Sequence, residues 1–182
     1  MSESGLVARR QAELRLRVGE HLRGGEECGA ALWVARVSGL PMVARVTRWQ
    51  GAPQGVLGFG GSVLPENPES GLSGTAADLH RHLPENDAAA ALALTGDRVM
   101  LLLAADSPPP EPAGWVRRLV GRGAPEPLPA LTPVWECPRS GLAGAEAGDP
   151  EGELRLRFAD GSGLAVAAPA MLALPFATQV SR

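Results

Sequence analysis

The strongest constraint on the fold is a pair of apolar runs, Ala88–Leu94 and Val99–Ala105, separated by a short polar turn. Gly96 and Asp97 form a two-residue connection of the hairpin type, in which glycine is able to take a positive φ. The two runs therefore predict an antiparallel hairpin. Its register pairs Leu94 with Val99, Leu92 with Leu101, and Ala90 with Leu103.

Both faces of this hairpin are apolar, and this restricts the architecture. The face opposite the residues just paired carries Ala91, Ala93, Met100 and Leu102. An antiparallel pair commonly exposes one face to water, which these side chains do not suit. A further element must cover the second face, and an N-terminal helix is the first candidate.

That helix is predicted over residues 7–23, within an N-terminal segment 1–25. Leu14, Val18 and Leu22 recur at helical spacing on one side, and a Gly-Gly pair ends the pattern. We expect the helix to pack on its own domain. Because the helix carries five arginines, a membrane-surface helix is an alternative, and pairing with another chain is a second one.

Residues 26–182 are expected to form a single β domain, and two more hairpins are predicted in it. The first joins Ala30–Val37 to Met42–Arg48, with Arg36 and Arg45 on its outer face.

The last hairpin spans residues 153–168. The alternation of polar and apolar residues favours a three-residue loop, Ala159 to Gly161, with Gly161 in the left-handed region. This register pairs Leu156 with Leu164 and Leu154 with Val166, and it turns Arg155 and Arg157 toward solvent.

Between these hairpins, strands are expected at Leu131–Cys137 and Leu142–Ala147, and the tail predicts one short helix started by Pro175. Two segments interrupt the pattern: a long irregular insertion at 50–87 and a Pro-rich loop at 106–130. Within that loop, Trp115, Arg117 and Arg118 form a candidate contact for phosphate or acidic lipid.

Residue types that are missing exclude several kinds of chemistry. All 17 basic residues are arginine, so P-loop and Schiff-base enzymes are excluded because both need a lysine. The two cysteines form no CxxC, and neither GxSxG nor GxGxxG is present. We therefore expect no catalytic, metal or cofactor-binding residues and no enzyme.

A stretch with two histidines has the alternating spacing of a metal site. On a strand, Asp78, His80 and His82 would share one side, as ligands do. The favoured interpretation is a solvated loop.

Charge and hydropathy indicate the environment of the chain. The formal net charge is −3 without a long run of one sign, which disfavours general nucleic-acid binding. No secretory signal or apolar stretch of about 20 residues is present. We expect a soluble, cytoplasmic protein with reduced thiols.

The segments LALTGDRVMLLL, VWECPRSGLAGAE and ELRLRFADGSGLAV resemble, in this order, motifs of small bacterial pleckstrin-homology-like (PH-like) domains of the high-GC actinobacterial type. The resemblance covers roughly residues 89–168, and GEECGAALWVARV resembles the usual first strand. It implies a mainly β fold, a partly open antiparallel barrel or sandwich of about seven strands. A short C-terminal helix would close one end.

These observations favour a non-enzymatic binding or scaffolding module whose ligand is an unidentified protein or a second copy of the chain. Peripheral binding to acidic lipid through outward arginines is the alternative, and a small hydrolase using the 50–87 insertion is the third hypothesis. The candidate ligand surface comprises Arg36, Arg45, Arg155, Arg157, Trp115, Arg117 and Arg118.

Overall fold

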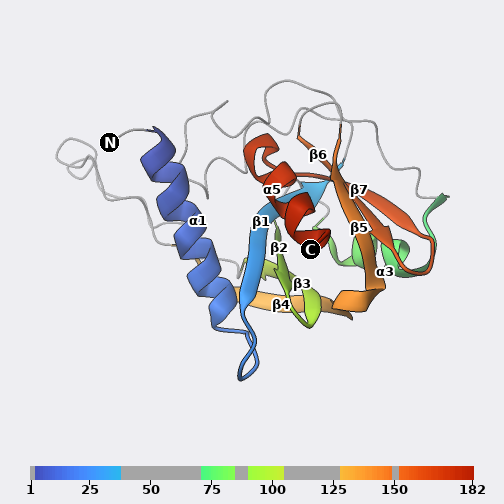
Figure 1. Ribbon diagram of the computed structural model, residues 1–182, viewed down its shortest axis with the longest axis horizontal. Coiled ribbons are helices and arrows are strands. Elements are labelled where there is room, and N and C mark those ends of the chain that lie inside the picture. Colours follow the sequence, from blue (N-terminus) through green and yellow to red (C-terminus); the bar gives the residue numbers. More distant parts are fainter. Residues whose placement is uncertain (1–2, 38–70, 85–89, 105–127, 149–151) are drawn as a thin grey trace.

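The computed structural model describes residues 3–37, 71–84, 90–104, 128–148 and 152–182. Seven antiparallel strands form one open sheet in the order β4-β3-β2-β1-β7-β6-β5 (Figure 1). The strands are β1 (Cys28–Arg36), β2 (Ala90–Thr95), β3 (Arg98–Ala104), β4 (Leu131–Pro138), β5 (Leu142–Ala147), β6 (Glu153–Phe158) and β7 (Gly163–Ala167). The helices are α1 (Glu3–Gly19), α3 (Gly74–His82) and α5 (Ala170–Val180), with the single turn η2 (Arg139–Gly141) between β4 and β5. The predicted fold class, mainly β with a helix near each end, is confirmed.

The β2–β3 hairpin has the predicted register at every pair. Its turn differs in one respect, because Gly96 does not take a positive φ. The Thr95 hydroxyl orders the turn instead, accepting hydrogen bonds from the backbone N–H groups of Asp97 (3.2 Å) and Arg98 (3.0 Å). A hydroxyl bonded to nearby backbone stabilises a turn locally.

Both faces of this hairpin are covered, as its composition requires. One face contributes Leu92 and Leu101 to the core inside the bent sheet. On the other face, Leu14 and Val18 of α1 pack in a second cluster that includes Leu102 and is completed by Ala31, Trp33, Ala91, Ala93, Met100, Leu128 and Leu131. The predicted cover by the N-terminal helix is confirmed.

Helix α1 begins and ends four residues earlier than the predicted span of 7–23. Gly19, which lowers helix stability by about 1 kcal/mol relative to Ala, is its last residue. The chain then turns, with the His21 N–H donating to the Val18 carbonyl at 3.0 Å.

Strand β1 belongs to both halves of the sheet. It pairs with β2 from Cys28 to Val34 and with β7 at Ala35 and Arg36. The predicted pairing of this strand with Met42–Arg48 along its whole length is therefore wrong, because β2 and β7 occupy part of each side. Residues 42–48 themselves lie outside the described residues.

The sheet bends around one core to which all seven strands contribute (Figure 1). Trp135 of β4 and Phe158 of β6 meet edge to face across it, with ring centroids 6.4 Å apart. The β6–β7 hairpin follows the predicted register, with Gly161 at φ +83°. The three-residue loop is therefore confirmed.

Helix α3 is a departure from the irregular insertion predicted at 50–87. Its apolar residues Ala76 and Leu79, followed by Leu83, are buried in the core. The β6–β7 turn caps its first turn, because Asp160 accepts hydrogen bonds from the N–H (2.7 Å) and hydroxyl (2.8 Å) of Thr75. These bonds and two from Ser162 lower the pKa of Asp160, with Ser162 the largest contributor.

Helix α5 starts at Ala170 rather than at the predicted Pro175, which lies inside it. A proline inside a helix costs about 3 kcal/mol. Burial of the apolar side of the helix offsets this cost, and the buried residues are Ala173, Phe176, Ala177 and Val180.

The intramolecular cover predicts the effect of Leu102→Asp. Leu102 is fully buried beneath α1, so a carboxylate there should lower the free energy of unfolding by about 4 kcal/mol. Urea denaturation measures the change, and size-exclusion chromatography should show a monomer before and after. Leu16→Asp is the control, because Leu16 on the same helix is 73% exposed. Equal midpoints for Leu102→Asp and the wild type would show that water reaches this face.

Candidate functional site

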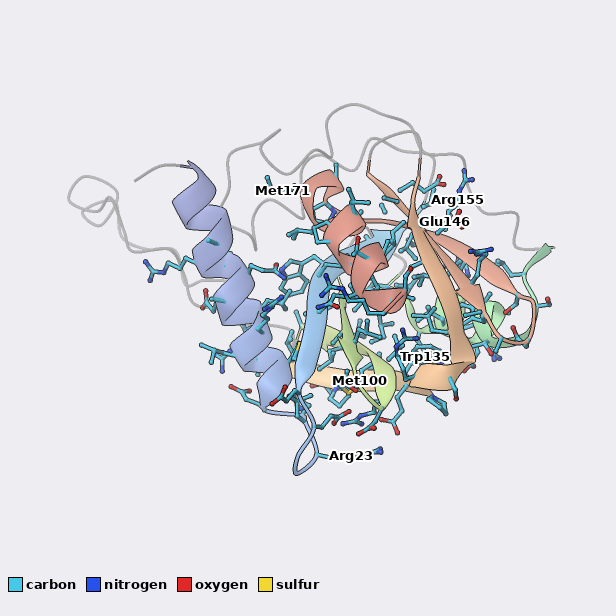
Figure 2. All side chains as sticks on the ribbon, in the orientation of Figure 1. Arg23, Met100, Trp135, Glu146, Arg155 and Met171 are labelled. Carbon is cyan, nitrogen blue, oxygen red and sulfur yellow. The ribbon has the colours of Figure 1, made fainter. Side chains whose placement is uncertain are left out.

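Two of the arginines expected on a ligand surface, Arg155 and Arg157, do lie on the exposed face of β6. Each has a carboxylate partner. Arg155 forms an ion pair with Glu153, and Arg157 pairs with Glu146 at 2.8 Å. Figure 2 shows Arg155 and Glu146 close together on neighbouring strands, where they are cross-strand partners. Their positive charge is therefore largely balanced locally.

Arg36, expected on an outer face, is half-buried. Its Nη2 donates to the carbonyl oxygens of His80 (2.9 Å) and Leu83 (3.1 Å), at the end of α3. The last carbonyls of a helix lack intrahelical partners and favour a cation. The prediction that Arg36 points outward is wrong, because the sequence analysis did not predict α3, whose last carbonyls bind the guanidinium.

Arg45, Trp115, Arg117 and Arg118 lie outside the described residues.

The stretch Asp78, His80 and His82 is helical, so its alternate residues point in different directions. Asp78 accepts a hydrogen bond from the Trp135 indole at 2.8 Å, and the His82 ring lies 2.8 Å from the Asp78 carbonyl oxygen. His80 is buried. Neither the solvated loop nor a metal site describes this stretch, and the described residues hold no group of three potential metal ligands.

An open groove lies between α1 and α5, with β1 at its base. Its volume is about 340 Å³, within the usual range for ligand sites. Leu172, Pro175 and Phe176 supply its apolar wall, and Arg15 and Arg182 its charges. Among the described residues that line it, none is Asp, Glu, His or Cys.

The base of the groove is the side of β1 that faces away from β2. In a hairpin with a two-residue turn, such as β2–β3, the residues flanking the turn form a hydrogen-bonded pair, and hydrogen-bonded pairs then occur at every second position. The residues of β2 between these pairs direct their backbone groups toward its other neighbour, β1. The observed register therefore directs the backbone groups of Ala30, Leu32 and Val34 toward β2. Those of Ala31 and Trp33 face the opposite side, and the Ala31 carbonyl accepts a hydrogen bond from the Gln11 amide of α1.

Charged contacts hold both helices that flank the groove. Beyond the end of α1, Arg98 binds Glu26 through two hydrogen bonds of 2.9 Å, and its Nη2 also donates to the His21 carbonyl. The Glu26 side chain is only 1% exposed, and hydrogen bonds from Arg98 lower its pKa to about 2. At the end of α5, Arg139 donates to the Val180 carbonyl.

The thiol nearest the groove is not activated. Cys28 begins β1 beside the lining residue Gly29, and burial raises its pKa above the ordinary value of 9.0. Burial likewise raises the pKa of Cys137 to about 11. Both side chains are therefore protonated at neutral pH and poor nucleophiles.

The sequence analysis missed the groove because its walls come from opposite ends of the chain. Gln11 and Arg15 lie beside the apolar stripe of α1, and Gln179 lies beside that of α5. This pattern alone gives no sign that the two helices flank one strand. Met171 and Leu174 of α5, 48% and 64% exposed, mark an apolar surface that only the structure reveals.

Among the described residues, no helix is long and apolar enough to span a bilayer. Comparisons with known protein families, curated proteins and solved structures find no match to this chain.

The buried Arg98–Glu26 pair predicts an acid-sensitive contribution to stability. The pKa of Glu26 is about 2 in the folded chain and near 4.5 without these contacts. The contribution is therefore complete above about pH 5 and is lost as the pH falls toward 2. Glu26→Gln should lower the free energy of unfolding by about 3–5 kcal/mol at pH 7.

Urea denaturation between pH 7 and pH 2 measures this contribution. The difference between wild type and Glu26→Gln should shrink through the acid range, whereas Glu27→Gln, at an exposed neighbour, should match the wild type. A difference that stays constant with pH would refute the assigned ion pair.

Proposed function

We propose that this chain is a non-enzymatic protein-binding module and that the groove between α1 and α5 is its binding surface. The observation that carries the proposal is the composition of the groove. An apolar wall lies beside a strand edge whose Ala31 carbonyl is bonded by the Gln11 side chain rather than by a described strand, and two arginines supply the only charges among the described lining side chains. Such a site binds by shape, apolar contact and backbone pairing.

The strand arrangement supports the same proposal. The seven strands wind around one core, and a C-terminal helix packs against them, which is the architecture that the resemblance to bacterial PH-like domains implies. Under this proposal the protein works as a cytoplasmic scaffold. The exposed apolar residues add a further argument: Met171 lies at the start of α5 on the side that faces α1 (Figure 2), beside the groove.

Lipid binding and hydrolysis have less support. The outward arginines of β6 are paired with carboxylates, so they offer little net attraction to an anionic surface. In the described part of the 50–87 insertion, His82 bonds a backbone carbonyl and Asp78 bonds an indole. Neither contact activates a hydroxyl nucleophile.

Filling the groove should abolish binding. A phage-displayed library of random 12-residue peptides, panned against the full chain, supplies the probe, and fluorescence polarisation of the recovered peptides measures affinity. Gln179→Trp places a large side chain in the groove lining and should weaken binding at least tenfold. Ala12→Trp, at an exposed position of α1 outside the lining, should leave it unchanged.

Three results would contradict the proposal. The first is equal affinity in the Gln179→Trp variant and the wild type, and the second is the recovery of no peptide at all. The third is salt-sensitive flotation of the chain with anionic but not neutral vesicles, which would favour the lipid alternative.

A further inference from the structure

We infer that the ligand of this groove is an extended, acidic segment of a partner protein that adds as a strand to the open edge of β1. The inference rests on the proposed function and specifies the ligand's conformation and charge. Three observations carry it: the place where β7 stops, the hydrogen bond from Gln11, and the charges of the lining.

Strand β7 stops pairing because of a proline two residues beyond its end. Its register sets Ala35 opposite Ala167, and two residues further along β1 the same register would set Trp33 opposite Pro169. Proline has no N–H to donate to a ladder, and at Pro169 the chain turns into α5. Among the described strands, none therefore continues beside β1 at Trp33 and Ala31.

The backbone of β1 at this edge is suited to accept another strand. The Ala31 carbonyl points into the groove, where the Gln11 side chain donates to it. An amide N–H of an incoming strand is the same kind of donor and can replace Gln11. Alternation along β1 places the backbone groups of Trp33 on the same side, two residues away. Addition of a peptide strand to such an edge is a common recognition mode.

The lining determines which side chains that strand carries. Arg15 of α1 and Arg182 beyond α5 both line the groove, and both are exposed. No carboxylate side chain among the described lining residues balances them, in contrast to Arg155 and Arg157. Because side chains alternate along a strand, one set of ligand side chains faces α1 and the other faces α5. The set facing α1 places a carboxylate toward Arg15. The set facing α5 is apolar against Leu172 and Phe176 and carries a carboxylate where it reaches Arg182.

The peptides recovered by panning test this specification. They should carry Asp or Glu among apolar residues and lack proline in the segment that pairs with β1. Arg15→Glu and Arg182→Glu should each weaken their binding about tenfold. Arg9→Glu is the matched control, because it makes the same charge change at an exposed position of α1 outside the groove. Lysine-substituted peptides should regain affinity for the Arg15→Glu, Arg182→Glu double variant.

The backbone contact has its own readout. Amide hydrogen exchange of the chain saturated with an acidic peptide should show slowed exchange at Ala31 and Trp33. Recovered peptides that are basic or helical, or that bind the Arg15→Glu variant as tightly as the Arg9→Glu variant, overturn this inference. If such peptides still lose binding in Gln179→Trp, the proposed function stands without it. If the Gln179→Trp variant binds these peptides as tightly as the wild type, both the proposed function and this inference fail.

Discussion

The structure depends on one constraint, the need to keep water from both faces of the β2–β3 hairpin. Its inner face carries Leu92 and Leu101, and its outer face carries Met100 and Leu102, all fully buried. A sheet of seven strands can curl over only one of these faces. The other requires α1, whose Leu14 and Val18 lie on it. Burial of each such leucine contributes about 2 kcal/mol, which fixes α1 against the sheet.

The position of α1 creates the groove. The helix lies over the outer face and extends past the edge of β1, while Pro169 turns the chain into α5 on the far side. The space left between them is bounded by secondary structure on three sides. The ion pair between Arg98 and Glu26 fastens the end of α1. In the proposed function, a strand edge framed in this way offers its backbone groups to a ligand.

Local patterns predicted the hairpins, and they did so for a physical reason. In both β2–β3 and β6–β7 the partner strand is a few residues away, so turn length and apolar alternation determine the register. The first hairpin was predicted wrongly by the same logic. Its strand pairs with β2, more than 50 residues further on, and alternation cannot distinguish that partner from a nearer one.

The candidate site could be predicted least. Arg155 and Arg157 were correctly placed on an exposed face, but their carboxylate partners are known only once strands are paired. Arg36 depends on α3, a short helix with few apolar residues. The groove depends on the juxtaposition of both ends of the chain, which no local pattern encodes.

Among the described strands, β2 pairs with one side of β1, and none pairs with its other side at Ala31 and Trp33. Amide hydrogen exchange along β1 of the free chain distinguishes the two sides. Leu32 and Val34, which pair with β2, should be strongly protected, and Ala31 and Trp33 should exchange at least tenfold faster. Uniform protection of all four amides would show that this edge is already paired, and the proposed addition of a strand would then be wrong.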